Sequence, residues 1–167
     1  ATARAQTGSA DIFSRYSARA AESWSVFLCP TSARGNWSGA HPFAVSDANS
    51  DGAETGALAA LTRATIKPSV LARFWRRVPD ISKVIGKDPN VVFKIGIGEV
   101  PWLHQVTFSI WPDAAAMAGF ARKGPHAEAI RAVRDGHWFS EELYARFAVL
   151  SDSGTWNGAS PLAKDRS

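Results

Sequence analysis

Residues 93–138, FKIGIGEVPWLHQVTFSIWPDAAAMAGFARKGPHAEAIRAVRDGHW, decide the fold of this chain. Residues 91–97 and 106–111 are rich in β-branched and aromatic side chains, and we predict two strands joined by a turn. A Pro-Asp pair then opens a predicted helix over 114–122, and a Gly-Pro pair separates it from a second predicted helix over 125–134. The stretch therefore predicts the order strand, turn, strand, helix, helix.

The flanking segments complete the pattern. Residues 57–66 predict a strand, and 68–77 predict an amphipathic helix with proline in its first turn, followed by a short helix over 80–85. Residues 141–150 predict a segment that begins as helix and ends as strand. The order β-α-β-β-α-β is typical of an α+β fold of the ferredoxin-like kind. Helices cover one face of such a sheet, so we expect a second sheet to cover the other, as in a dimeric α+β barrel.

The first third of the chain predicts less regular structure. A strand over 24–30 ends at a proline. The other expected segments are a flexible lead-in over 1–10, a short helix over 10–22, loops over 31–40 and 46–56, and a tail over 163–167.

An internal repeat links the two ends of the chain. The segment GNWSGAHPF (35–43) matches GTWNGASPL (154–162) at five of nine positions. With a one-residue shift, Trp24 also falls on Tyr144 in the preceding strands. We interpret residues 11–56 as part of a first repeat, whose front we expect outside this sequence, and 57–162 as a complete second repeat. A chance match of Gly/Trp loops is the alternative.

Composition excludes several classes of protein. The 167 residues suit one domain, and the net charge of +4 without aromatic-basic interleaving gives no indication of nucleic-acid binding. The single Cys29 excludes an intrachain disulfide and predicts a buried thiol in a reducing, cytoplasmic setting. No run is long enough for a membrane span. Seven tryptophans favour an aromatic core or an apolar ligand pocket.

The histidines are the main candidates for chemistry. His126 follows Gly-Pro at a predicted helix start, where a neutral imidazole could be an axial haem ligand, although a capping or solvated histidine is the simpler reading. His104 enters a predicted strand, His137 lies near a helix end, and His41 has a serine counterpart in the repeat, which argues against an essential role. No zinc spacing, nucleophile elbow or dinucleotide loop is present. An aromatic cavity without a nucleophile favours a cofactor that supplies the chemistry.

Seven segments cover most of the chain from residue 19 onward: RAAESWSVFL (19–28), SARGNWSG (32–39), LTRATIKP (61–68), FWRRVPDIS (74–82), FKIGIGEVPW (93–102), QVTFSIWPDAAAMAGFAR (105–122) and HAEAIRAVRDGHWFSEELYARFAVL (126–150). Together they resemble the spheroidene monooxygenase family of carotenoid biosynthesis. The resemblance implies a haem-dependent oxidoreductase that introduces a keto oxygen into an acyclic carotenoid with O2 and reduced ferredoxin. Family members carry a longer N-terminal region.

The resemblance carries over no ligand assignment, so His126 as iron ligand and catalytic residue is our own hypothesis from the sequence. The expected remainder of the cofactor site is His104, Trp102, Phe108, Trp111, Phe120 and Trp138 as lining, with Arg122 or Lys94 near a haem propionate. We expect a homodimer that binds an apolar polyene, accepts electrons from ferredoxin and contacts the inner membrane peripherally. A cofactor-independent α+β-barrel monooxygenase, a non-enzymatic haem or polyene carrier, and an inactive fragment are the alternatives.

Overall fold

The computed structural model describes residues 14–45, 56–76, 88–98, 102–122, 128, 131–133 and 135–165. The chain divides into two compact units. Residues 28–150 form the larger unit, and the residues before 28 and after 150 form the smaller one. The predicted short helix over 80–85 and the loop over 46–55 lie outside the described residues.

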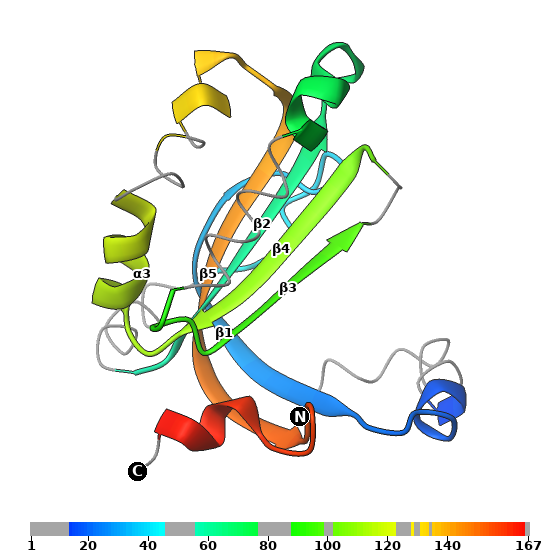
Figure 1. The fold of residues 1–167 in the computed structure, drawn as a ribbon, viewed down its shortest axis with the longest axis vertical. Coiled ribbons are helices and arrows are strands. Elements are labelled where there is room, and N and C mark those ends of the chain that lie inside the picture. The colour runs from blue at the N-terminus through cyan, green and yellow to red at the C-terminus, as the bar shows by residue number, and fades with distance from the viewer. Residues whose placement is uncertain are drawn as a thin grey trace. The chain divides into compact units, whose positions relative to one another are not determined.

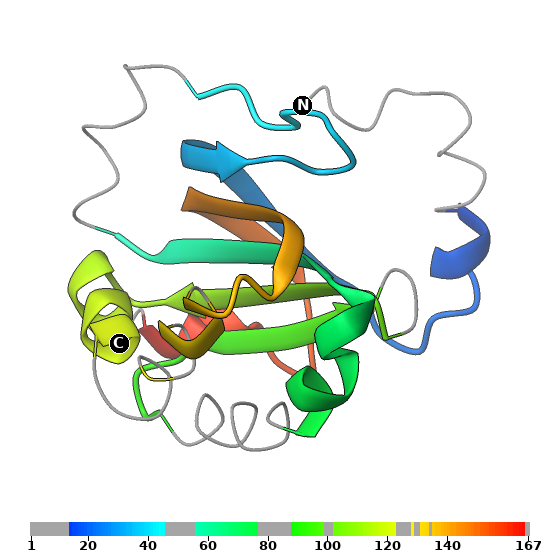
Figure 2. The ribbon, with the colours of Figure 1, turned by 90° about the horizontal axis from the view of Figure 1, so that it is seen from above.

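Five strands form one sheet in the order β1-β5-β2-β4-β3. They are β1 (Trp24–Gly35), β2 (Leu58–Ile66), β3 (Phe93–Gly98), β4 (His104–Trp111) and β5 (Phe139–Gly154) (Figure 1). β2 pairs antiparallel with both β4 and β5, and β3 pairs antiparallel with β4. In the view of Figure 2, β2, β4 and β3 run side by side. The order β5-β2-β4-β3 is the ferredoxin-like one, so the predicted α+β class is confirmed.

The described helices follow the prediction closely. Helix α3 (Ala114–Arg122) has the predicted bounds, and the Asp113 carboxylate accepts the N–H of Ala116 at 2.7 Å, which caps its first turn. The segment predicted as helix from residue 68 begins with a 3-10 turn, Pro68–Val70, and continues as helix over 71–76. Residues 128 and 131–133 are helical, as predicted, while His126 lies outside the described residues.

Strand register assigns side chains to two faces, because directly opposed residues point the same way. One face, here called the apolar face, carries Ala59, Leu61, Arg63, Val106, Phe108, Ile110, Leu143, Ala145 and Phe147. The other face carries Leu58 and Trp111 and contacts α3, because Trp111 lies 5.1 Å from Phe120 between ring centroids. Phe43 packs edge-on against Phe147 at 4.9 Å, so residues following β1 cover part of the apolar face.

Two local predictions of secondary structure are wrong, and a third segment is more regular than expected. Residues 141–150 do not begin as helix, because all of them belong to β5, where buried Leu143, Ala145 and Phe147 alternate with exposed residues. That period of two outweighs the helix propensity of the two glutamates. The strand predicted to end at Pro30 continues to Gly35, because β1 is an edge strand and an edge tolerates proline. Residues 163–165, expected as a tail, belong to the 3-10 helix Pro161–Asp165.

The two repeated loops have the same conformation. Gly35 and Gly154 have φ of 94° and 89°, and Ser38 and Asn157 have φ of 52° and 56°. Each loop is closed by a bridge, Trp37 to Ala40 in one and Trp156 to Ala159 in the other. The division into repeats stays a prediction.

The predicted one-residue shift in the strands before these loops is wrong. Glu141 binds the first loop and Glu22 binds the second in the same way. Counted back from each loop without a gap, Glu22 therefore corresponds to Glu141, and Trp24 corresponds to Leu143 rather than Tyr144.

Candidate functional site

The end of the sheet where β5 begins contains a bulge and a pocket. Thr65 of β2 pairs with Glu141, but Ile66 pairs with Phe139, so Ser140 is the extra residue and its hydroxyl lies 3.3 Å from the carbonyl oxygen of Thr65. The pocket, here called the bulge pocket, has a volume of about 380 Å³. Its lining residues are Gly35, Asn36, Val133, His137, Trp138, Phe139, Ser140, Glu141 and Glu142. β-Bulges are frequent beside functional sites because they redirect side chains.

A buried ion pair lies against this pocket. The Arg63 side chain is 1% exposed, and its Nη1 donates to Glu141 Oε1 at 2.6 Å. The same nitrogen lies 3.5 Å from the Thr65 hydroxyl, and the guanidinium lies 5.2 Å from the ring centroid of Trp37. Arg63 is thus held by a carboxylate and an indole on the apolar face, which satisfies its charge away from water.

Glu141 is bound in its ionised form. Its oxygens accept the backbone N–H groups of Gly39 at 2.8 Å and Ser38 at 2.9 Å. These two backbone hydrogen bonds, and then the bond and charge of Arg63, lower the pKa of Glu141 below the ordinary value of 4.5. Glu141 is therefore a fixed negative charge at neutral pH and not a proton donor.

His104 lies in the same end of the sheet. It is the register partner of Thr65 on one side, and Glu141 is the partner of Thr65 on the other. The three residues form a row across β4, β2 and β5 on one face, with neighbouring strands about 4.8 Å apart. His104 is half-buried there. The structure thus places His104, a predicted cofactor residue, near the Arg63–Glu141 ion pair. The sequence analysis had not predicted this ion pair.

An aromatic series runs from an exposed tryptophan to the bulge pocket. Trp102 is 62% exposed, and its ring lies 5.1 Å from Trp75, whose Nε1 donates to the Trp102 carbonyl oxygen at 2.9 Å. The ring centroids of Trp75 and Phe74 are 5.5 Å apart, and those of Phe74 and Phe139 are 6.1 Å apart. Phe139 lines the bulge pocket. These four residues are here called the aromatic series. Such a surface suits a long apolar molecule.

Trp102 also has an unusual backbone. Its φ is 74°, a left-handed conformation that is rare for a bulky residue and costs of order 1–3 kcal/mol. The hydrogen bond from Trp75 and the edge-on ring contact hold it in place. A strained, exposed aromatic residue of this kind is more typical of a binding surface than of a core.

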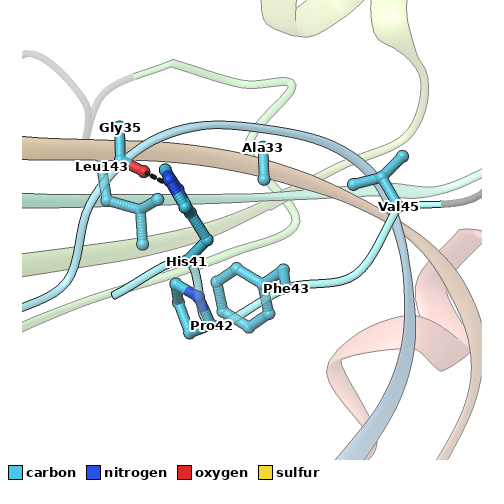
Figure 3. Close-up of a pocket in the computed structure, with 7 residues that line it drawn as sticks. All are labelled: Ala33, Gly35, His41, Pro42, Phe43, Val45 and Leu143. Atoms are coloured by element: carbon cyan, nitrogen blue, oxygen red, sulfur yellow. Dashed lines mark hydrogen bonds between the residues drawn. The ribbon is translucent and has the colours of Figure 1, made fainter. Parts of the chain in front are cut away.

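A second pocket of about 210 Å³ lies beside His41 (Figure 3). Its lining residues are Ala33, Gly35, His41, Pro42, Phe43, Val45 and Leu143. The His41 Nδ1 lies 3.1 Å from the Gly35 carbonyl oxygen, and because a carbonyl oxygen can only accept, Nδ1 is the donor in this contact. His41 thereby connects the two ends of its loop, which explains its presence structurally.

The remaining predicted site residues do not surround one cavity. Trp111 is 2% exposed, and its Nε1 donates to the Ser109 hydroxyl at 3.0 Å, so it is sealed against Phe120. Phe108 lies on the opposite face, beside Phe93. Lys94 and Arg122 are exposed on β3 and at the end of α3. The pairing register separates Phe108 from Trp111, because residues three apart on a strand point to opposite faces.

Trp138 is the one predicted lining residue in the bulge pocket. It is 4% exposed, and the Arg73 guanidinium lies 5.9 Å from its ring centroid. His137, which the sequence analysis left outside the site, lies in the same pocket with φ of 48° and is exposed. Its place after a Gly at a helix end was the only sequence signal for it. Arg63 could have been noticed as the one charged residue in the strand Leu58–Ile66.

The described residues do not gather the predicted cofactor residues around one cavity. Within the described ranges, no group of three or more His, Cys, Asp or Glu side chains could hold a metal ion. The predicted iron ligand, His126, is outside those ranges, and the predicted lining is divided between two faces of the sheet. Trp138 and His137 are the aromatic and imidazole side chains of the bulge pocket that a flat cofactor could contact.

Three curated relatives match nearly the whole chain. "Spheroidene monooxygenase" from Cereibacter sphaeroides is 52% identical over 98% of this chain and 50% of its own length. Proteins of the same name from Rhodobacter capsulatus and Rubrivivax gelatinosus are 51% and 40% identical, over 68% and 59% of their own lengths. The chain thus spans between 50% and 68% of the length of these relatives. No family model matches the chain.

A solved structure supports the fold alone. A crystallised protein from Fusobacterium nucleatum aligns over 94% of this chain and 65% of its own, with a TM-score of 0.55 and 10% identity. Among the helices of the described residues, none is long and apolar enough to cross a membrane.

Proposed function

The chain belongs to the spheroidene monooxygenase family, and on that premise we propose that it forms part of an enzyme that introduces a keto oxygen into an acyclic carotenoid. The observation that carries the proposal is the 51% identity to the Rhodobacter capsulatus relative over 68% of that protein. At that identity, shared chemistry is the simplest expectation, although the fold alone would not imply it.

The aromatic series supports a polyene substrate. Trp102 offers an exposed apolar entry, and Phe139 leads to the bulge pocket. A rigid, elongated hydrocarbon would find flat aromatic side chains along the aromatic series, whereas the bulge pocket at its inner end also presents polar side chains such as His137 and Ser140. The Arg63–Glu141 ion pair lies beside the bulge pocket and would hold the end of β2 against the start of β5. Because the pKa of Glu141 is lowered, this carboxylate would not serve as a proton donor.

The proposed reaction converts a methylene group to a carbonyl in two rounds. Each round consumes one O2, two electrons and two protons, places one oxygen atom on carbon and releases one water. The second round yields a geminal diol that loses water to form the ketone. Reduced ferredoxin, a one-electron donor, is the proposed reductant, and two equivalents serve each round.

Haem is the proposed cofactor, and it would supply the activation of O2. The described residues do not themselves form its cavity, so His126 as iron ligand remains a proposal that rests on the sequence. Homodimer formation and peripheral contact with a membrane that delivers the polyene are further parts of the proposal. The proposed substrate class does not depend on the haem, the iron ligand, the homodimer or the membrane contact.

The test combines a spectrum with a turnover assay. Protein expressed with a haem supply is reduced and exposed to carbon monoxide, and a shifting Soret band indicates bound haem with an open iron face. The same sample receives spheroidene, reduced ferredoxin and O2 labelled with ¹⁸O. We expect a ketone that carries the label, and loss of the Soret band in His126→Ala.

The outcomes separate the alternatives. Labelled ketone without a Soret band would indicate a cofactor-independent monooxygenase. A Soret band or polyene binding without turnover would indicate a carrier. A folded sample that neither binds spheroidene nor turns it over would contradict the proposed function. Unchanged haem occupancy and an unchanged Soret band in His126→Ala would show that another residue holds the iron.

A further inference from the structure

The two repeated loops have equivalent surroundings, each within its own unit. In the larger unit, the N–H of Asn36 donates to the carbonyl oxygen of Glu142 at 3.0 Å. In the smaller unit, the N–H of Thr155 donates to the carbonyl oxygen of Ser23 at 2.9 Å. These bonds follow the same correspondence as the two glutamates that hold the loops. The side chains around the two loops can therefore be compared position by position.

The second loop is joined to its surroundings by three bonded side chains. The Oδ2 of Asp152 accepts the indole N–H of Trp24 at 2.8 Å and also accepts the hydroxyl of Ser160. The Ser160 oxygen in turn accepts the N–H of Leu162 at 3.2 Å. These polar groups therefore satisfy one another within the smaller unit, as polar groups beside a core generally do.

The first loop has different side chains at the corresponding positions. In the order Asp152, Trp24 and Ser160, the counterparts are Ala33, Leu143 and His41. All three counterparts line the pocket of about 210 Å³ in Figure 3, here called the His41 pocket. Alanine and leucine are smaller than aspartate and tryptophan, which accounts for open space at this loop. The serine counterpart of His41 thus marks a difference in chemistry between the two loops.

The His41 imidazole has one nitrogen in use. Nδ1 donates to the Gly35 carbonyl oxygen at 3.1 Å, which holds the ring at the edge of the pocket (Figure 3). In a neutral ring, a proton on Nδ1 leaves Nε2 as an acceptor. Among the described residues, nothing donates to this Nε2. The other side chains that line the pocket are all apolar: Ala33, Pro42, Phe43, Val45 and Leu143. An acceptor beside apolar walls is complementary to a hydroxyl group on an apolar molecule.

We propose that the His41 pocket is a binding site for a small apolar molecule whose hydroxyl group donates to His41 Nε2. The pocket is smaller than the roughly 300–1,000 Å³ of sites for drug-sized ligands, so the occupant is about the size of a single substituted ring. All the lining residues lie in the larger unit, and Gly35 also lines the bulge pocket. The site does not require the proposed oxygenation, so either proposal can fail without the other.

The test uses p-cresol and p-xylene, two probes of nearly the same size. p-Cresol carries a hydroxyl group where p-xylene carries a methyl group, so only p-cresol can donate a hydrogen bond. Binding to the ¹⁵N-labelled chain is followed through the amide signals of residues 33–45 at about pH 8.5, where an ordinary imidazole is neutral. We expect both probes to shift these signals, and p-cresol alone to shift the Nε2 signal of His41.

Two substitutions separate the hydroxyl contact from the pocket itself. His41→Phe keeps an aromatic ring without nitrogens, and it should weaken p-cresol binding about threefold to tenfold while p-xylene binds as before, as expected for the loss of one hydrogen bond. Ala33→Leu, at an exposed lining position, should fill the pocket and weaken both probes about tenfold or more. Ala72→Leu, at an exposed position on the helix over 71–76, is the matched control and should change neither affinity.

The other outcomes would contradict the site or the hydroxyl contact. Signals that stay unshifted at millimolar probe, or unchanged binding of both probes by Ala33→Leu, would overturn the site. Equal effects of His41→Phe on the two probes would show that His41 only holds its loop, and would overturn the hydroxyl contact. If circular dichroism shows that His41→Phe does not fold, the wild type decides. A shift of its Nε2 signal with p-cresol and not with p-xylene would support the contact, and the same response to both probes would overturn it.

Discussion

Arg63 and Glu141 are 78 residues apart in the sequence, yet their side chains meet at 2.6 Å between Nη1 and Oε1. The Arg63 side chain is 1% exposed and that of Glu141 is 24% exposed. The pair joins β2, β5 and the loop after β1, because Glu141 also holds the backbone of Ser38 and Gly39. This contact therefore connects the bulge pocket, which Glu141 lines, to the buried core around Arg63.

The two partners should not be equally sensitive to substitution. Glu141→Gln leaves the buried guanidinium without a counter-charge, whereas Arg63→Met removes the buried charge and leaves Glu141 near solvent with its two amide donors. We expect Glu141→Gln to lower the urea midpoint clearly and Arg63→Met to lower it less. Urea unfolding followed by circular dichroism measures both. Glu142→Gln, on the exposed side of β5, is the control, and equal midpoints for it and Glu141→Gln would contradict the interpretation.

The same carboxylate predicts how stability depends on pH. The folded-state pKa of Glu141 is lowered below 4.5 by the amides of Gly39 and Ser38, so its contribution is complete above pH 4.5 and is lost as the pH falls through the folded value. Urea unfolding of the wild type and Glu141→Gln between pH 7 and pH 3 should therefore show a difference that shrinks below about pH 4.5. A difference that stays constant over this range would show that the glutamine acts through packing.

Two features of Gly35 should make it sensitive to substitution: its left-handed backbone conformation and the lack of room for a Cβ atom. Its φ is 94°, and a Cβ there would overlap the carbonyl oxygen of Glu142, whereas a Cβ at Gly39, with φ of 77°, would meet nothing within 4 Å. Gly39→Ala should lose about 1 kcal/mol of unfolding free energy from the left-handed conformation alone. Gly35→Ala should lose about 2 kcal/mol or more, because the strand or the loop must also move. Chemical denaturation compares the two, and similar losses would refute the steric argument.

Trp102 should matter for ligand binding more than for stability. Its ring is 62% exposed, so Trp102→Ser should change the unfolding free energy by about 1 kcal/mol at most, while spheroidene binding should weaken about threefold to tenfold through lost aromatic contact. Fluorescence titration with spheroidene in detergent measures the affinity. Trp156→Ser removes a tryptophan of comparable exposure in the smaller unit and is the matched control. Equal weakening by both substitutions would argue against an entry at Trp102.

The ferredoxin-like order could be predicted from the sequence. Patterns at 57–66 and 106–111 predicted the strands found at Leu58–Ile66 and His104–Trp111, and the Pro-Asp start with an Ala-rich run gave α3 its bounds, because these signals are local and repeat within a few residues. The sequence did not determine the start of β5, where two glutamates favour helix locally and burial of Leu143 and Ala145 between neighbouring strands decides otherwise.

The candidate site depends on the tertiary structure. The contacts of Arg63 with Glu141, of Trp75 with Trp102, and of Glu22 with Gly158 join residues far apart in the chain. The contact of Arg63 with Glu141 depends on which strands are neighbours and in which register, and a shift of one residue would turn every side chain of a strand to the other face. A periodic pattern gives the face but not the partner, so Phe108 and Trp111 were grouped in one predicted cavity although the pleat of β4 directs them to opposite sides.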